Sequence, residues 1–244
     1  MKEPTLTQKL VAECIGTALL TLIGAGSVTA TFVINNGGKS SPFTEADLGV
    51  ISFAFGLIIV AMVYSIGKVS GCHINPAVTI ALLVTGRTNV TTAASYIIAQ
   101  FVGGLLGGLA IVLWFGTSVV TSGINGVTAY GASTSAWQAV VAEAIGTFIL
   151  VFTIFGVAVD SRAPAGWAGL VIGLVVVAII MTLGPVTNAS LNPARSFGPV
   201  LVRTLFGGPS AWGQYWVYVV GPVLGAIAGG MTYDFVAAPK AAGK

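Results

Sequence analysis

The sequence predicts an all-α membrane protein with six transmembrane helices and two re-entrant half-helices, built as an inverted repeat of two halves. The first observation is composition: 55% of the 244 residues are hydrophobic and 7% are charged, whereas soluble domains have roughly 25% charged residues. The second is a set of six apolar stretches that reach the roughly 20 residues needed to cross a bilayer. The third is a short motif that occurs once in each half of the chain.

The expected spans are bounded by polar residues or by Gly and Pro breaks. They lie at residues 9–34, 48–68, 93–115, 137–159, 167–183 and 212–236. The first stretch is too long for the apolar core of a signal peptide, so we interpret it as a retained span. Two further apolar segments, 76–84 and 193–202, are too short to cross, and each begins with Pro at a first helical position. We expect them to be half-helices.

The two halves of the chain resemble each other. Two short patterns recur, at Ala12-Glu13 with Gly16-Thr17 and Asn75-Pro76-Ala77 in the first half, and at Ala142-Glu143 with Gly146-Thr147 and Asn192-Pro193-Ala194 in the second. Because each half holds three spans, an odd number, the second copy must insert upside down, which gives an inverted repeat. We expect a single domain over 1–244, with the first repeat at about 8–116 and the second at about 136–237.

Basic residues predict the orientation. With six crossings both termini lie on one side, and the side richer in Lys and Arg is cytoplasmic. The side of the termini carries Lys2, Lys9, Lys68, Arg87, Arg162, Lys240 and Lys244, and the other side carries Lys39, Arg195 and Arg203. This predicts a multi-pass protein of the cell membrane with both termini cytoplasmic. The net charge of +3 comes from scattered residues without a basic run, so nucleic acid is not an expected partner.

The sequence favours no cofactor, metal site or enzyme activity. Cys14 and Cys72 fall in or beside apolar segments and form no CxxC pair. His73, the single histidine, has no Cys, His or carboxylate neighbour at metal-ligand spacing. A nucleophile, a base and an orienting group do not converge on any one motif.

The duplicated Asn-Pro-Ala motif carries the expected chemistry. A half-helix of nine residues is about 13 Å long, so two of them end to end span roughly the 30 Å apolar core. Their N-termini then meet near the midplane, where Asn75 and Asn192 offer amide N–H groups and the helix ends add partial positive charge. The extended segments 70–74 and 187–191 must line a water-filled cavity, because unwound backbone is not tolerated against lipid.

These residues carry a family resemblance. Segments 71–79 (GCHINPAVT) and 190–198 (SLNPARSFG) resemble the two signature loops of the aquaporin, or major intrinsic protein, family. The resemblance covers essentially the whole chain and is strongest to the archaeal branch. It implies a passive channel for water and small uncharged solutes such as glycerol or dissolved gases, which excludes protons and ions, and it implies a homotetramer in the bilayer. The implied pore signature is Asn75, Pro76, Ala77, Asn192, Pro193 and Ala194.

Three polar residues have alternative roles. Glu13 and Glu143 lie inside the first and fourth spans, and an ionisable group at that depth indicates function. The resemblance implies that each accepts hydrogen bonds from the backbone of its re-entrant loop, and a proton relay is the alternative. His73 either anchors its loop or lines the pore.

The resemblance also implies a selectivity filter of Phe55, Ile180, Ala189 and Arg195. These residues lie twenty before Asn75, twelve and three before Asn192, and three after Asn192. Water-selective members typically carry His at the position of Ile180, and glycerol-conducting members tend to have an aromatic residue at the position of Ala189. This chain matches neither, so we expect a wider and more apolar ring than a strict water filter. Interfacial snorkelling is the alternative for Arg195 and the favoured interpretation of Arg203.

Two other membrane functions remain open. A secondary transporter also uses inverted repeats and broken helices, with Glu13 and Glu143 as possible coupling groups. A structural or junctional membrane protein of the same fold is the third class. Linear, non-saturating solute flux would favour the channel over both.

Overall fold

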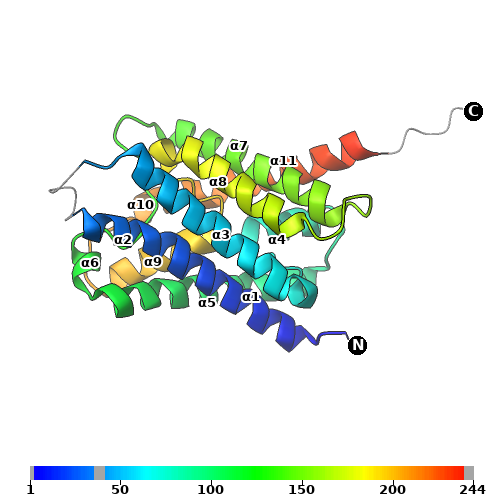
Figure 1. Ribbon diagram of the computed structural model, residues 1–244, viewed down its shortest axis with the longest axis horizontal. Helices are drawn as coiled ribbons and strands as arrows, with labels where there is room; N and C mark the ends of the chain where they lie inside the picture. The colour runs from blue at the N-terminus through cyan, green and yellow to red at the C-terminus, as the bar shows by residue number, and fades with distance from the viewer. Residues whose placement is uncertain (1–2, 36–41, 239–244) are drawn as a thin grey trace, which may run out of the picture.

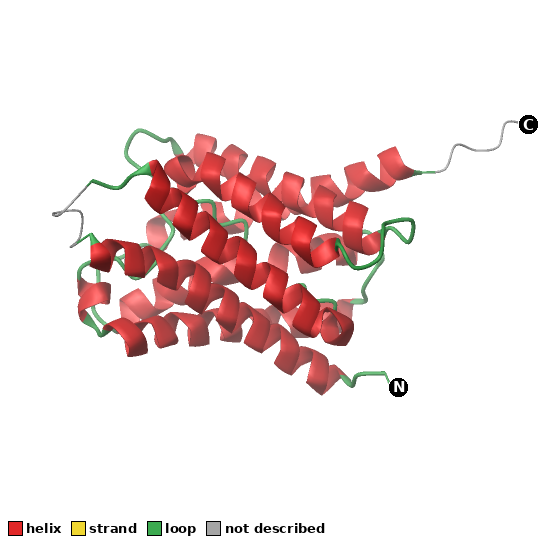
Figure 2. Ribbon diagram, in the orientation of Figure 1, coloured by secondary structure: helices red, strands yellow, loops and turns green. Residues whose placement is uncertain are grey.

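The computed structural model describes residues 3–35 and 42–238, and every regular element within them is helical. Of the basic residues used for orientation, Lys2, Lys39, Lys240 and Lys244 lie outside the described residues. Figures 1 and 2 show the helices packed lengthwise in one bundle. The elements are α1 (Leu6–Leu20), η1 (Thr21–Ala25), α2 (Gly26–Ile34), α3 (Glu45–Ser70), α4 (Pro76–Val84), α5 (Val90–Phe115), α6 (Ser118–Thr121), α7 (Ala136–Ile154), η3 (Phe155–Val159), α8 (Ala168–Thr187), α9 (Pro193–Leu205), α10 (Trp212–Tyr215) and α11 (Val217–Ala237).

The prediction of six membrane-length helices is confirmed. Within residues 3–35 and 42–238, six apolar helices of 20 to 29 residues occupy the predicted stretches, and their ends lie within four residues of the expected ones. The first and fourth each contain a π-helical turn, η1 and η3, which the sequence pattern did not indicate. The half-helix α4 matches its predicted bounds, and α9 continues three residues further, to Leu205.

The two half-helices lie in opposite halves of the bundle. Figure 1 shows both chain ends at one end of the molecule, called here the termini end, with α4 in that half and α9 towards the opposite, or α6, end. Each half-helix starts at an Asn N-cap followed by Pro, which lacks the N–H that a first helical residue leaves unpaired. Their starts therefore face each other inside the bundle.

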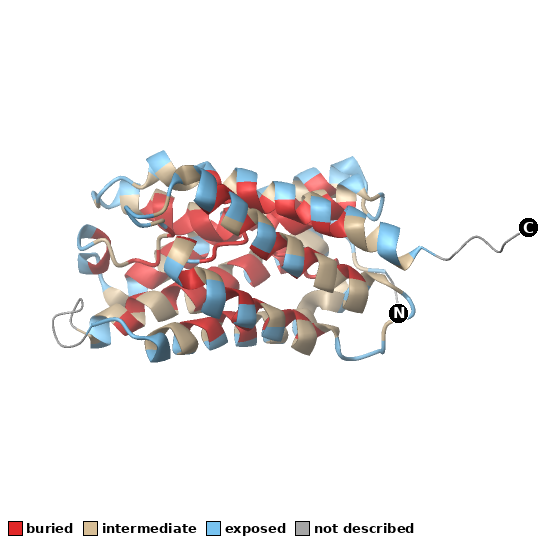
Figure 3. Cartoon of the chain, turned by 90° about the horizontal axis from the view of Figure 1, so that it is seen from above, coloured by how far each residue is buried: buried red, intermediate tan, exposed pale blue. Residues whose placement is uncertain are grey.

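Small residues let the helices approach closely. A Cβ added to Gly103 in α5 would lie 2.3 Å from the carbonyl oxygen of Cys14 in α1, and one added to Gly225 in α11 would lie 2.0 Å from that of Ala144 in α7. Such spacing is typical of membrane helices, where close van der Waals packing drives association. Figure 3 shows buried positions concentrated inside the bundle and exposed ones on its outer faces, as expected for a chain surrounded by lipid.

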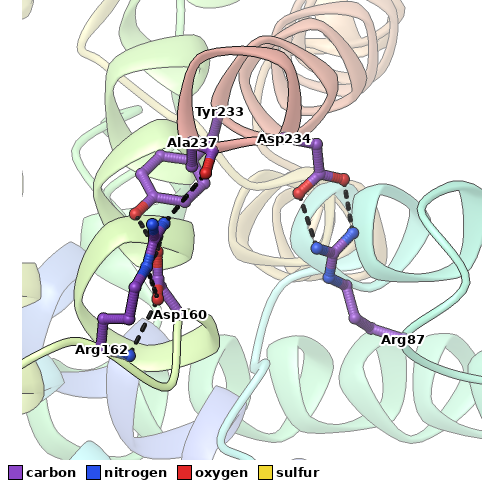
Figure 4. A network of polar contacts seen from close by, with 6 residues as sticks. All are labelled: Arg87, Asp160, Arg162, Tyr233, Asp234 and Ala237. Carbon is purple, nitrogen blue, oxygen red and sulfur yellow. Dashed lines mark hydrogen bonds and ion pairs between the residues drawn. The ribbon is translucent and has the colours of Figure 1, made fainter. Parts of the chain in front are cut away.

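Charged residues fasten α11 at the termini end, as Figure 4 shows. The Arg87 guanidinium donates two 2.6 Å hydrogen bonds to the carboxylate of Asp234. Arg162 pairs with Asp160, which also accepts a bond from the Tyr233 hydroxyl at 2.8 Å. Hydrogen bonds from Arg162 hold the pKa of the Asp160 carboxyl well below its usual range, so this carboxylate stays charged at neutral pH. The last turn of α11 is thereby tied to two neighbouring loops.

Candidate pore

The two loops that precede the half-helices adopt the same unusual backbone. Cys72 and Ile74 in the first loop have φ values of 51° and 41°, and Ala189 and Leu191 in the second have 43° and 57°. These pairs stand at the same distances before Asn75 and Asn192. A left-handed conformation is strained for residues with side chains, at about 1–3 kcal/mol each. Surrounding contacts must therefore hold both loops in place.

Glu13 supplies those contacts for the first loop. Its Oε1 accepts hydrogen bonds from the His73 backbone N–H at 2.9 Å and from the Ser70 hydroxyl at 2.6 Å. Its Oε2 accepts from the Ile74 N–H at 2.6 Å and from the Gln100 side-chain amide at 2.8 Å. A fully buried carboxylate with four donors is well compensated for its loss of water.

Glu143 has the equivalent place in the second loop. Its Oε1 accepts from the Ser190 N–H at 2.9 Å and the Thr187 hydroxyl at 2.7 Å, and its Oε2 accepts from the Leu191 N–H at 2.8 Å. Each loop also receives a hydrogen bond from a tyrosine hydroxyl: Tyr96 donates to the Ser70 carbonyl and Tyr218 donates to the Thr187 carbonyl. In this geometry both carboxylates accept hydrogen bonds from their loops.

The signature asparagines join the two loops at their meeting point. Asn75 Nδ2 donates to the Leu191 carbonyl at 2.8 Å, and Asn192 Nδ2 donates to the Ile74 carbonyl at 2.8 Å. Each Oδ1 accepts the backbone N–H of the alanine two residues later, Ala77 or Ala194, and so caps its half-helix. Each amide nitrogen carries two hydrogens, so each keeps one beyond its bond to the opposite loop.

Two cavities follow one another through the bundle. The inner cavity, of ≈ 260 Å³, is lined by both loops and both asparagines and reaches Arg87. The outer cavity, of ≈ 660 Å³, lies towards the α6 end and is lined mainly by apolar residues of α2, α3 and α8. The residues that line both cavities are Phe55, Ile180 and Arg195. These three side chains therefore stand at the junction between the cavities.

The junction brings together three of the four residues predicted for a filter. The guanidinium carbon of Arg195 lies 4.9 Å from the centre of the Phe55 ring, within the range of a cation–π contact. Arg195 Nη1 donates to the Gly126 carbonyl at 3.1 Å. Arg195 is 2% exposed, so its side chain stays at the junction and does not extend to the membrane surface. Ala189 lines only the inner cavity, on the side of the asparagines.

His73 and Cys72 both line the inner cavity. His73 Nδ1 is paired with the Thr79 hydroxyl at 3.1 Å, and its ring packs edge-on against Tyr96 with centroids 5.0 Å apart. The residue therefore anchors its loop and also faces the cavity, so both of its expected roles are compatible with its position. Cys72 is 8% exposed, and Cys14 does not line either cavity.

Arg203 is expected to snorkel to the membrane surface, and the structure shows which groups its guanidinium binds. Its Nε donates to Asn125 Oδ1 at 2.8 Å, and its Nη2 donates to the Gly123 carbonyl at 2.6 Å. Asn125 in turn donates to the Pro199 carbonyl. The guanidinium thus holds the loop after α6 against α9, because a half-buried guanidinium needs hydrogen-bond acceptors within the protein.

Several residues of the site were missed by the sequence interpretation. Leu20 and Leu150 line the inner cavity, as do Val63 and Ile172. The Tyr218 hydroxyl contact was also missed. The repeat itself could have indicated them, since Leu20 and Leu150 stand seven residues after Glu13 and Glu143.

Comparisons with known proteins agree with this geometry. The family model described as Major intrinsic protein matches residues 1–233. Aquaporin AqpM of Methanothermobacter marburgensis is 44% identical over 241 residues, covering 95% of this chain and 98% of that relative. A probable aquaporin AqpM of Archaeoglobus fulgidus is also 44% identical, covering 96% and 98%. A probable aquaporin NIP4-2 of Arabidopsis thaliana is 40% identical, covering 95% and 75%.

A solved structure shows the same fold. The aquaglyceroporin from Plasmodium falciparum superimposes with a TM-score of 0.84, covering 96% of this chain and 97% of that one, at 23% sequence identity. The family model and the archaeal relatives each extend over nearly the whole chain. The six apolar helices, the two half-helices and the paired Asn-Pro-Ala loops thus belong to a membrane protein of the major intrinsic protein (aquaporin) family.

Proposed function

We propose that the chain is a passive transmembrane channel that conducts water, admits some small uncharged solutes and excludes protons and ions. The observation that carries this proposal is the reciprocal pairing of Asn75 and Asn192 at the wall of the inner cavity. Each amide retains an N–H for a passing oxygen, and both half-helices direct their positive ends towards the same point. A cation entering this point meets donors and positive potential, while a water oxygen is bound.

Phe55, Ile180 and Arg195, with Ala189 beside them, form the selectivity filter in this proposal. Arg195 supplies a fixed positive charge that opposes cations. Ile180 supplies no hydrogen-bonding group, and Ala189 leaves room, so the ring is more permissive than one with histidine. Glycerol and dissolved gases are the small uncharged solutes that fit such a ring.

Glu13, Glu143 and His73 hold the loops in this proposal and take no part in proton transfer. The carboxylate oxygens of Glu13 and Glu143 accept hydrogen bonds from the strained loops, and Nδ1 of His73 is paired with the Thr79 hydroxyl. Pro76, Ala77, Pro193 and Ala194 start the half-helices that carry the asparagines. No metal, cofactor or catalytic step is assigned to the chain.

The same proposal includes topology and assembly. We assign one domain to the chain, with repeats at about 8–116 and 136–237, because equivalent contacts recur in both halves. The termini end, with Lys9, Lys68, Arg87 and Arg162, is taken as the cytoplasmic side of the cell membrane. A homotetramer follows from the family resemblance.

Stopped-flow light scattering on proteoliposomes tests the proposal. An inward sucrose gradient should shrink protein-containing vesicles faster than empty ones, and a glycerol gradient should then be followed by measurable re-swelling. Flux that rises linearly with the gradient supports a channel. Saturating flux that depends on an ion gradient would identify a transporter, and osmotic permeability equal to that of empty vesicles would favour a structural role.

A further inference from the structure

The four filter residues have counterparts in the other half of the chain. Val63 stands twelve residues before Asn75, as Ile180 stands before Asn192. Cys72 stands three before Asn75, as Ala189 stands before Asn192, and Val78 stands three after Asn75, as Arg195 does after Asn192. Ile172 precedes Asn192 by twenty residues, as Phe55 precedes Asn75.

All four counterparts line the inner cavity. Because the half-helices enter from opposite ends, these residues belong to the half of the cavity towards the termini, beyond the asparagines. Cys72, Val78 and Ile172 are 8%, 4% and 7% exposed. Val63 is half-buried, so three of the four side chains leave little surface open to solvent.

The two sets differ in chemistry. The filter has a guanidinium and an aromatic ring, whereas its image has three aliphatic side chains and a thiol, which is only a weak hydrogen-bonding group. A fifth pair of equivalent positions differs in side-chain size. Gly24, which follows Glu13 at the distance at which Ile154 follows Glu143, has no side chain and leaves space for Phe55. Ile154 instead lines the inner cavity with Ile172. The image ring therefore has no strong side-chain donor or acceptor.

We propose that Val63, Cys72, Val78 and Ile172 form a second selectivity ring that limits the passage of polyols. This inference rests on the proposed channel function and adds a barrier on the cytoplasmic side. A hydrophobic constriction disfavours solutes that must shed hydration to pass. Water keeps bonds to its neighbours in a file, whereas glycerol must turn several hydroxyls towards an apolar wall that has no side-chain donor equivalent to Arg195 of the filter. The ring and the filter act as two resistances in series.

Val63→Thr tests the ring because threonine has nearly the same shape as valine and adds a hydroxyl. The matched control is Val50→Thr, which makes the same change on the outer side of α3, away from both cavities, where Val50 is 65% exposed. Both proteins are compared with the parent in proteoliposomes, per incorporated protein, for water and glycerol flux. Val63→Ala, which removes apolar wall without adding a polar group, is the second variant.

Glycerol permeability of Val63→Thr should rise, by at most about tenfold, the factor that one net hydrogen bond gives, while water permeability changes less and Val50→Thr behaves as the parent. Val63→Ala should also raise glycerol flux. The series arrangement also predicts the result in an Ile180→His background. There the narrower filter contributes more of the total resistance, so Val63→Thr should raise glycerol permeability by a smaller factor.

Two results overturn the inference in different ways. Unchanged glycerol flux in both Val63 variants, with normal water flux, would show that the filter alone limits the passage of polyols. If Val63→Thr raises glycerol permeability by the same factor in the Ile180→His background, the substitution loosens the protein in general. If the parent protein itself does not conduct water, both the proposed channel function and the second ring are wrong.

Discussion

Gly24 leaves the space in which the ring of Phe55 lies: a Cβ built on Gly24 would be 2.2 Å from Cε1 of that ring. Gly24 belongs to the π-helical turn η1, and Phe55 belongs to α3. The absence of a side chain at one position therefore fixes the orientation of the aromatic wall at the junction of the two cavities. Phe55 in turn supports the guanidinium of Arg195 from 4.9 Å away.

Gly24→Ala should narrow the channel. The new methyl group displaces the Phe55 ring towards the lumen, because the ring is the part of that contact that can move, and the overpacking costs about 1–3 kcal/mol. Water permeability in proteoliposomes should fall, with a lower thermal unfolding midpoint. Gly131→Ala is the control, since nothing lies within 4 Å of its added Cβ. Parent-like water flux in Gly24→Ala would mean that Phe55 does not set the width.

Ile180→His should make the filter more selective. A histidine places a hydrogen-bonding ring at the junction beside Phe55 and Arg195 and occupies part of the apolar space that a carbon backbone needs. Glycerol permeability should drop by more than water permeability in the same vesicles. An equal drop in both would show that Ile180 is not part of the discriminating ring.

Cys72 should confer sensitivity to mercurials from the cytoplasmic face. It lines the inner cavity, whereas Ala189 leaves the other side of the asparagines without a thiol. In vesicles sorted by orientation, a membrane-impermeant mercurial should block water flux from the side of the termini only. Cys72→Ser should be resistant and Cys14→Ser should remain sensitive. Inhibition that persists in Cys72→Ser, or is absent from the parent, would place the thiol out of reach.

Glu143→Gln should loosen the second loop. The carboxylate accepts from three donors through both oxygens, whereas a glutamine presents one oxygen and turns an N–H towards another N–H. The loss should be about 1.5–3 kcal/mol, the range for a hydrogen bond to a charged group. We expect a lower unfolding midpoint and reduced water flux, with the exposed Glu3→Gln unchanged. Rapid proton flux in the parent that disappears in Glu143→Gln would instead support a relay.

The fold could be predicted from the sequence almost completely. Six spans, two half-helices and their bounds follow from apolar length and from Asn-Pro signals, because the bilayer imposes a fixed length on each crossing. The contacts of Glu13 and Glu143 with the loops lie where the family resemblance implied them. That these two carboxylates support the loops during conduction is a prediction.

Other features depend on packing that a linear pattern does not contain. The π-helical turns and the role of Gly24 arise from side chains that meet across helices, so only the arrangement in space reveals them. Arg203 shows the same limit: its partners Gly123 and Asn125 lie in a loop about eighty residues earlier. A charge near a helix end gives no indication of such a partner.

The most direct test of the central claim compares water and proton flux through the same protein. Parent proteoliposomes loaded with a pH-sensitive dye are given first an osmotic gradient and then a pH gradient. Paired amide donors, opposed half-helix dipoles and Arg195 predict fast water flux, with proton flux no greater than in empty vesicles. Proton flux that rises in proportion to water flux would contradict the account.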